Sequence, residues 1–250
     1  MLARVLPSLM VALCLLAVWE VYSRFSGVSA LILPAPSSVL RALLLNRNEI
    51  TGHARSTISV AVIGFALSVG FAFATSVALH VAPLAERGLM PLFVVSQTVP
   101  LVALAPLMIL WFGFGHLPKI LLVILVTFFP MLLSLLSGYR QTPSEFRDLL
   151  AAMGAKRWGI FFRATLPSAR SAFLAGLRIS ATYAIVATIF AEYAGARRGL
   201  GIYILAAKNN FRADLVLAAV LVSAALTLML LGVIWVIDRL TVRGAQMDHA

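Results

Sequence analysis

Six long apolar segments, separated by polar stretches, organise the chain. A helix rises about 1.5 Å per residue and the hydrocarbon core of a bilayer is about 30 Å thick, so about 20 apolar residues make one span. These runs are too long and continuous for the alternating strands of a membrane barrel, so the pattern predicts helices. The predicted spans are residues 5–25, 57–81, 89–112, 117–136, 172–194 and 213–237. We therefore expect an all-α membrane protein of about six transmembrane helices, forming one domain over residues 1–250.

The ends of the first span and the segment after it leave alternatives open. Arg4 precedes the first apolar run as in a secretory signal, but no small-x-small cleavage site follows, so we expect a retained span. After the breakers Pro34 and Pro36, residues 39–47 fit either a short helix at the membrane interface or a plain amphipathic connector.

Composition agrees with a membrane setting and narrows the chemistry. Hydrophobic residues make up 62% of the chain and charged residues 12%, and the mean hydropathy is +1.00. A net charge of +11 would suggest nucleic acid for a soluble protein, but Arg and Lys lie mostly at span ends, where they contact anionic lipid. The single Cys14 excludes an internal disulfide, and the four histidines show no metal-ligand spacing. We expect a lipid-contacting protein with no nucleic acid, metal or cofactor.

The loop at residues 139–171, which we call the hook, is the one long polar insertion between predicted spans. It holds six basic residues against two acidic ones, so the positive-inside rule predicts that it is cytoplasmic. Six spans then place both termini inside as well. This assignment puts 11 of the 20 Lys and Arg residues on the inner side and 9 on the outer side, including Arg197 and Arg198, so orientation depends mainly on the hook.

Within the hook, the pattern predicts two short helices separated by Gly154. Thr142-Pro143-Ser144-Glu145 is a helix start, Leu166-Pro167 is a stop, and apolar residues recur at helical spacing over 144–162. Such a structure is either a docking element for a partner protein or an amphipathic loop that lies on the inner leaflet. The chain has no Gly-x-x-x-x-Gly-Lys-Ser/Thr loop, so any ATPase would be a separate polypeptide.

The hook resembles the coupling loop of binding-protein-dependent ABC importer permeases, Glu-Ala-Ala-x3-Gly-x9-Ile-x-Leu-Pro. Asp148, Gly154 and Leu166-Pro167 fall at the spacing of this pattern. Asp148 replaces the Glu, which puts in doubt any contact that needs the longer side chain. The resemblance implies a type I permease fold with a cytoplasmic coupling helix, and it implies that the ATPase contacts Asp148, Gly154, Ala155, Leu166 and Pro167.

The resemblance covers essentially the whole chain. Leu33-Pro34-Ala35-Pro36-Ser37, the segment 106–115, and Ala191-Glu192-Tyr193 with Gly199-Leu200-Gly201 are similar to the nitrate, sulfonate and taurine permease group. Segments 96–106 and 181–185 are more similar to permeases for hydroxymethylpyrimidine-type thiamine precursors. This implies a non-catalytic subunit of the inner membrane. Its implied partners are cytoplasmic ATPase subunits, a second permease copy in a homodimer, and an external substrate-binding protein.

Polar residues within the spans are candidates for a translocation pathway, because polar groups are unfavourable in a bilayer. Ser96, Gln97 and Thr98 lie in the third span, which Pro100 and Pro106 are expected to loosen. These three residues either line the pathway or hydrogen-bond neighbouring helices. Tyr183 in the fifth span could stack on a planar solute. Glu192 is expected either to pair with Arg197 or Arg198 at the interface, or to act at an external gate.

A secondary carrier and a membrane enzyme are the alternative classes of protein, and both fit the sequence less well. A secondary carrier would show intramembrane acids and inverted repeats, whereas the acidic residues here lie near predicted span ends and no repeat is detectable. An enzyme would need a nucleophile, a base and an orienting group on one face, and no such cluster is evident. A permease remains the leading hypothesis.

Overall fold

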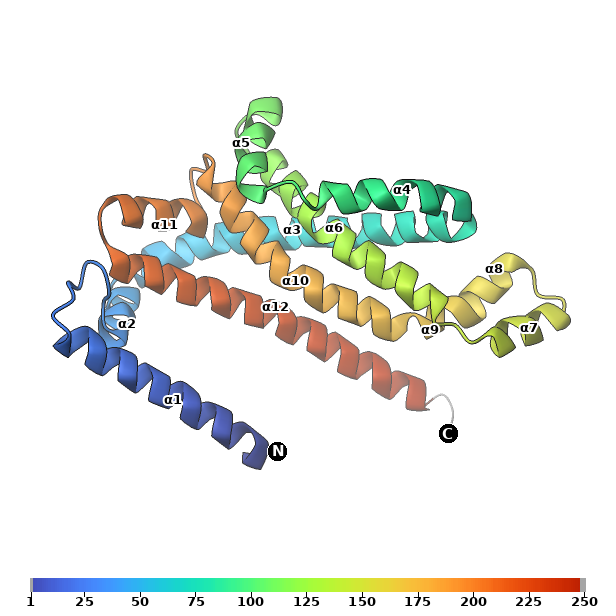
Figure 1. Cartoon of the computed structure of the whole chain (residues 1–250), viewed down its shortest axis with the longest axis horizontal. Coiled ribbons are helices and arrows are strands. Elements are labelled where there is room, and N and C mark those ends of the chain that lie inside the picture. The colour runs from blue at the N-terminus through green and yellow to red at the C-terminus, as the bar shows by residue number, and fades with distance from the viewer. Residues whose placement is uncertain (1, 248–250) are drawn as a thin grey trace.

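The computed structural model describes residues 2–247, and every regular element in that range is a helix (Figure 1). Five of these helices are long and apolar enough to cross a membrane, and a sixth span results if the bent pair α4 and α5 counts as one. The five are α1 (Leu2–Phe25), α3 (Arg47–Val81), α6 (Leu117–Arg140), α10 (Arg170–Tyr193) and α12 (Ala213–Met247). The predicted all-α membrane fold is confirmed.

The predicted third span, 89–112, is not one helix. It is split into α4 (Pro83–Ser96) and α5 (Leu101–Phe112), whose axes differ by 99°. Pro100 lacks an N–H and disfavours helical backbone at the residue before it, and α4 ends just before this point. The apolar pattern predicted the position of this span but not the 99° turn, because hydropathy records apolar length and not backbone direction.

The core of the bundle lies between α3, α6 and α10. Their facing surfaces bury Val123, Leu132 and Leu135 of α6 against Ala181 and Ala184 of α10. Glycines allow the close approach: a Cβ at Gly64 would lie 2.7 Å from the Val123 Cβ, and one at Gly176 would lie 2.7 Å from the Ser134 Cβ. Many apolar side chains elsewhere on these helices are exposed in the single chain, as expected of a lipid-facing surface.

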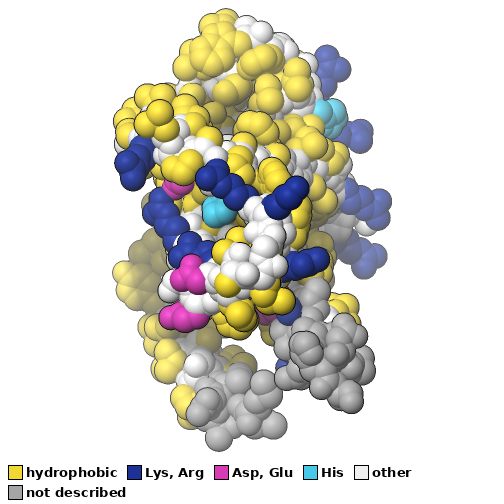
Figure 2. Space-filling model, turned by 90° about the vertical axis from the view of Figure 1, so that its right-hand side faces the viewer, with side chains coloured by type: hydrophobic (Ala, Val, Ile, Leu, Met, Phe, Trp, Pro, Cys, Tyr) yellow, Lys and Arg dark blue, Asp and Glu magenta, His cyan; other side chains and the backbone are white. Residues whose placement is uncertain are grey.

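The hook forms one end of the bundle and contains the predicted pair of helices around Gly154. Its elements are α7 (Ser144–Ala152), α8 (Arg157–Ile160), a π-helical turn (Phe161–Thr165) and α9 (Leu166–Ser168). Seen from the hook end, Lys and Arg side chains gather on this face (Figure 2). The opposite end, which we call the far end, holds the start of α6, the end of α10 and the short helix α11 (Figure 1).

Two short helices lie toward the far end. The helix predicted at 39–47 is α2 (Pro36–Leu45), which starts three residues earlier because Pro36 occupies its first turn. Glu20 of α1 accepts hydrogen bonds from the Ser37 backbone N–H at 3.0 Å and from its hydroxyl at 2.7 Å, which ties α1 to α2. α11 (Leu200–Asn209) was not predicted, because its ten residues are too short for a span.

Candidate functional site

A cavity of about 390 Å³, which we call the mid-bundle cavity, lies beside the break between α4 and α5. Ser96 and Gln97 line it from the break, and Tyr183 lines it from α10. Three of the predicted pathway residues are therefore brought together, although 86 positions separate Gln97 from Tyr183. The other lining residues are Val99, Leu101, Leu104, Leu125, Val126, Pro130 and Val186.

Thr98 and Glu192 do not line this cavity. The Thr98 hydroxyl donates to the Val95 carbonyl oxygen at 2.8 Å, and the Ser96 hydroxyl donates to the Phe93 carbonyl oxygen at 2.7 Å. Both hydroxyls thus bond to carbonyls of α4 itself rather than to a neighbouring helix. The polar groups that this geometry leaves for a solute are the Gln97 amide and the Tyr183 hydroxyl, both on exposed side chains.

Glu192 lies at the far end with a side chain that is 0% exposed. Its carboxylate accepts hydrogen bonds from the Thr57 hydroxyl, which lies 2.9 and 3.0 Å from the two oxygens, and from the Gly201 N–H at 2.8 Å. The expectation that it pairs with Arg197 or Arg198 was wrong, because these bonds hold it inside the bundle. The carboxylate caps the N-terminus of α11, where the helix dipole favours negative charge.

Thr57 and His53 complete this cluster from α3. The Thr57 hydroxyl oxygen also accepts the Leu200 N–H at 2.8 Å, and His53 Nδ1 accepts the Gly199 N–H at 3.0 Å. The first backbone groups of α11 are therefore bonded to α3 and α10 at the same time. We call Glu192, Thr57, His53 and the segment Gly199 to Gly201 the far-end network.

Tyr203 packs on the far-end network from α11. Its ring centroid lies 5.1 Å from that of His53. Burial raises the pKa of the Tyr203 phenol, and the nearby Glu49 carboxylate raises it further, so the phenol stays protonated at neutral pH. The contact holds α11 against the start of α3.

Replacing Thr57 by valine should destabilise the chain. Valine keeps the shape of the side chain but leaves the Leu200 N–H and the Glu192 carboxylate each short of a partner, so we expect a loss of about 1–3 kcal/mol. The readout is the melting temperature of the detergent-solubilised chain. Ser56→Ala is the matched control, since the exposed Ser56 hydroxyl makes only a 3.4 Å bond. Equal melting temperatures for the two variants would contradict the role given to Thr57.

In the hook, the residues singled out by sequence separate into exposed and buried groups. Asp148, Gly154 and Pro167 are exposed, whereas Leu166 packs against the core of the bundle. Gly154 has φ +82°, and the Ala155 N–H donates to the Leu150 carbonyl oxygen at 2.9 Å, which closes the end of α7. Ala155 is half-buried behind this turn.

The hook also presents apolar side chains that no described part of the chain covers. Phe146 and Leu149 of α7 and Met153, the residue that follows this helix, recur at helical spacing and are 62%, 58% and 74% exposed. Exposed apolar groups that gather on one face mark a surface for a partner or a membrane. Basic residues outnumber acidic ones around them, with Arg147, Lys156, Arg157 and Arg163 against Glu145 and Asp148 in the same segment.

An aromatic cluster anchors the hook to the spans, and sequence reasoning missed it. Phe161 is buried, and its ring centroid lies 5.3 Å from that of His80 in α3 and 5.4 Å from that of Tyr139 in α6. The Tyr139 hydroxyl lies 3.0 Å from the Ser76 hydroxyl. No local spacing could reveal this cluster, because its members come from three separate elements. A displacement of the hook would therefore be transmitted directly to α3 and α6.

Comparison with known proteins gives consistent results. Residues 66–243 match the family model of the binding-protein-dependent transport system inner membrane component. The formylaminopyrimidine transport permease protein ThiX of Halalkalibacterium halodurans is 34% identical over 76% of this chain and 76% of its own length. The taurine transport system permease protein TauC of Escherichia coli is 30% identical over 86% of this chain and 81% of its own.

Among solved structures, the MetNI methionine ABC transporter in an inward-facing conformation contains a chain of similar fold. The TM-score is 0.59 at 13% sequence identity, and the match covers 78% of this chain and 97% of that one. This likeness concerns the fold alone.

Proposed function

The chain belongs to the binding-protein-dependent transport system inner membrane components, the permeases of ATP-binding-cassette importers, and we propose that separate ATPase subunits drive it. In this proposal the chain carries a small polar solute inward by alternating access and has no catalytic role of its own. The observation that carries the proposal is the hook, with its uncovered apolar face and its aromatic link to two spans. As a multi-pass permease, the chain lies in the inner membrane.

The hook would dock in a cleft of the cytoplasmic ATPase. Its basic residues favour a cytoplasmic position by the positive-inside rule, and both termini would then lie in the cytoplasm. Asp148, Gly154 and Pro167 are exposed and suited to contact the ATPase, whereas Ala155 and Leu166 would hold the hook in shape. ATP binding and hydrolysis would move the hook and, through Phe161, the spans.

Co-expression with the ATPase encoded beside this chain, followed by affinity purification, tests the proposal. We expect the ATPase to co-purify with the wild-type chain and to be lost with the double variant Gly154→Arg and Pro167→Ala. A Cβ at Gly154 would meet nothing within 4 Å, so the added bulk faces the partner and not the bundle, and the φ of +82° also strains the turn that ends α7. Undiminished co-purification with the double variant would count against docking at the hook.

The pathway would form where the mid-bundle cavity faces a second copy of the chain. The α4–α5 pair and α1 leave apolar side chains exposed, and α1 packs mainly against the short α2. A homodimer would cover part of this surface and enclose the cavity between two chains, while lipid covers the remainder. An external binding protein would deliver the solute to the far end.

For the solute, we propose a thiamine precursor such as hydroxymethylpyrimidine, with a sulfonate, taurine or nitrate as the alternative. The name of the 34% identical relative refers to formylaminopyrimidine, and that of the 30% identical relative refers to taurine. Tyr183 and Gln97 offer a ring and an amide, which suit a planar, hydrogen-bonding pyrimidine. The test is uptake of labelled hydroxymethylpyrimidine in the presence of unlabelled taurine. If taurine outcompetes the pyrimidine, the alternative is favoured.

Substitutions in the mid-bundle cavity should reduce uptake without affecting assembly. We expect Tyr183→Ala and Gln97→Ala each to lower the initial uptake rate about three- to tenfold, the loss of one stacking or hydrogen-bonding contact. Thr98→Ala is the matched control, because Thr98 neighbours Gln97 but does not line the cavity. ATPase co-purification should be the same for all three variants. An uptake defect of equal size in Thr98→Ala would contradict the assignment of the cavity.

A further inference from the structure

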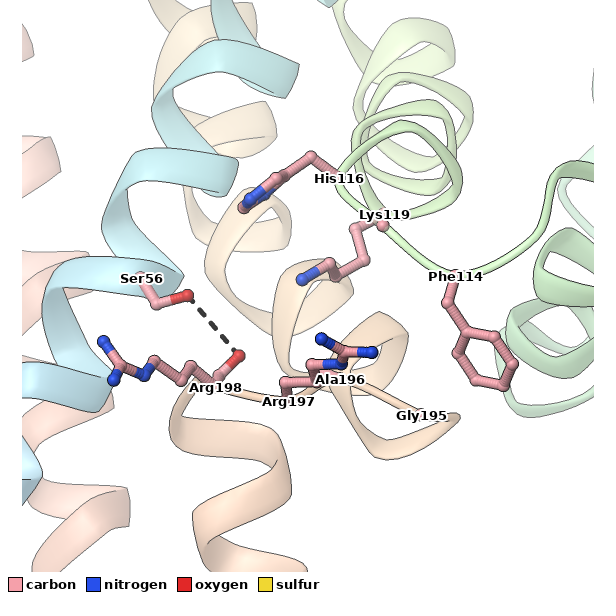
Figure 3. Close-up of a pocket in the computed structure, with 9 residues that line it drawn as sticks. Ser56, Phe114, His116, Lys119, Gly195, Ala196, Arg197 and Arg198 are labelled. Carbon is pink, nitrogen blue, oxygen red and sulfur yellow. Dashed lines mark hydrogen bonds between the residues drawn. The ribbon is translucent and has the colours of Figure 1, made fainter.

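A second cavity, of about 530 Å³, lies at the far end (Figure 3). Ser56 of α3, Lys119 of α6 and the loop that follows α10 surround it, and Figure 3 shows the Lys119 side chain pointing from α6 toward that loop. His116, Arg197 and Arg198 also line the cavity. Its volume falls in the range of small-molecule sites. The mid-bundle cavity and the hook share none of these residues.

Lys119 is the unusual member of this set. Its side chain is only 8% exposed, and it donates no hydrogen bond to any residue that the structure describes. A buried ammonium group is unfavourable unless an acceptor or an opposite charge compensates it. The carboxylate that acts on it electrostatically is that of Glu192, whose two oxygens are already bonded to Thr57 and Gly201. The Lys119 ammonium group therefore has no hydrogen-bond partner among the described residues, and it is available to a ligand in the cavity.

The remaining charges make the cavity more positive. Arg197 and Arg198 lie at its rim, and His116 is exposed beside them. The Ser56 hydroxyl is turned toward the Arg198 carbonyl oxygen, at 3.4 Å. On the proposed orientation this end faces outward, where the positive-inside rule does not favour arginine pairs. A ligand that uses these charges would account for them.

We propose that this cavity binds a small oxyanion, meaning a carboxylate, sulfonate or phosphate group, with Lys119 as its buried cationic ligand. Arg197 would complete the site from the rim, since guanidinium groups form paired hydrogen bonds with oxyanions. The Arg198 side chain points away from Lys119 and would contribute its charge alone (Figure 3). The oxyanion could belong to a free solute or to a lipid headgroup. The inference goes beyond the proposed function, because the chain alone would bind the ion, without an ATPase or a binding protein.

Calorimetric titration of the purified chain with sodium sulfate tests the proposal, in nanodiscs of phosphatidylcholine and at constant ionic strength set with chloride. We expect saturable binding to the wild-type chain and affinity about tenfold or more lower in Lys119→Gln, the loss of a charge-assisted hydrogen bond. Lys208→Gln is the matched control, because Lys208 is an exposed lysine of α11 at the same end. Its affinity should equal that of the wild type.

Additional variants keep the proposal testable if Lys119→Gln does not fold, and a second lipid composition identifies the source of the oxyanion. Arg197→Gln and Arg198→Gln change only rim residues, and each should weaken sulfate binding several-fold whether or not Lys119→Gln folds. If nanodiscs containing phosphatidylglycerol suppress sulfate binding to the wild type, the site is occupied by a lipid headgroup, and the proposal stands. Sulfate binding unaltered in all of the Lys119, Arg197 and Arg198 variants would overturn it. The proposal would also be overturned if sulfate, phosphate and acetate all failed to bind while an acidic protein docked at this end in a Lys119-dependent way.

Discussion

Replacing Gly199 by alanine should be among the most damaging single substitutions in this chain. A Cβ at this position would lie 2.1 Å from Cδ of Glu192 and 2.2 and 2.4 Å from its two oxygens. Because Glu192 is fixed by Thr57 and Gly201, the carboxylate cannot move away without losing both hydrogen bonds. Gly199 also has φ +137°, which side chains rarely adopt. We expect a loss of roughly 4 kcal/mol or more in the free energy of unfolding.

Substitutions at two other glycines separate the two causes of this loss, which are backbone strain and the close approach of neighbouring atoms. Gly27 has φ +74°, and a Cβ added there would meet nothing within 4 Å, so Gly27→Ala should show backbone strain alone, about 1–2 kcal/mol. Gly201 is helical, but its Cβ would lie 2.3 Å from the Ile189 carbonyl oxygen, so Gly201→Ala should show the close approach alone. Melting temperatures of the solubilised variants provide the comparison. If Gly199→Ala and Gly27→Ala have the same melting temperature, the tight packing around Glu192 is refuted.

The second large effect is expected at the apolar face of the hook. The double variant Leu149→Glu and Met153→Glu places two charges where an ATPase cleft would cover apolar side chains. We expect the affinity for the ATPase to fall about 30-fold or more, as at interface hot spots, and transport to fall with it. Because both side chains are largely exposed, the melting temperature of the chain itself should not change.

Leu31→Glu controls for the chemistry of this change. Leu31 is 63% exposed in the turn before α2, near the far end, so the same substitution there should leave ATPase binding intact. Affinity is measured with the purified ATPase and the chain in nanodiscs. Full affinity in the hook variant, or an equal loss in Leu31→Glu, would exclude the apolar face as the docking surface.

The spans were predictable because bilayer thickness fixes the length of an apolar helix, and five long helices obey it. Pro100 and Pro106 predicted a loosened helix near residues 97–100 but not a full break, because a proline in a span can either bend a helix slightly or end it. The neighbours decide between the two. In this chain α5 turns away at 99° to pack on α6 and α10. Direction is a tertiary property that the apolar pattern does not contain.

Glu192 shows why a functional interpretation of a single residue can fail. In the sequence it stands five and six positions from Arg197 and Arg198, and an ion pair was the natural expectation. In the fold its main partner is Thr57, 135 positions away. The available local signal was Gly199-Leu200-Gly201, which starts α11 and leaves room for the carboxylate. By contrast, the two helices separated by Gly154 were predicted correctly, because a glycine that ends a helix is a local signal. The predicted stop at Leu166-Pro167 was wrong, because helical backbone continues through α9 to Ser168 and Pro167 is accommodated in its first turn.

Reconstitution in proteoliposomes tests the central claim most directly, with the chain, its ATPase and the binding protein combined and labelled solute supplied outside. The claim predicts uptake that requires ATP, stops when the ATPase is omitted, and persists when an ionophore collapses the proton gradient. Accumulation of solute by the chain alone, without ATP but dependent on a proton gradient, would contradict the claim and identify a secondary carrier.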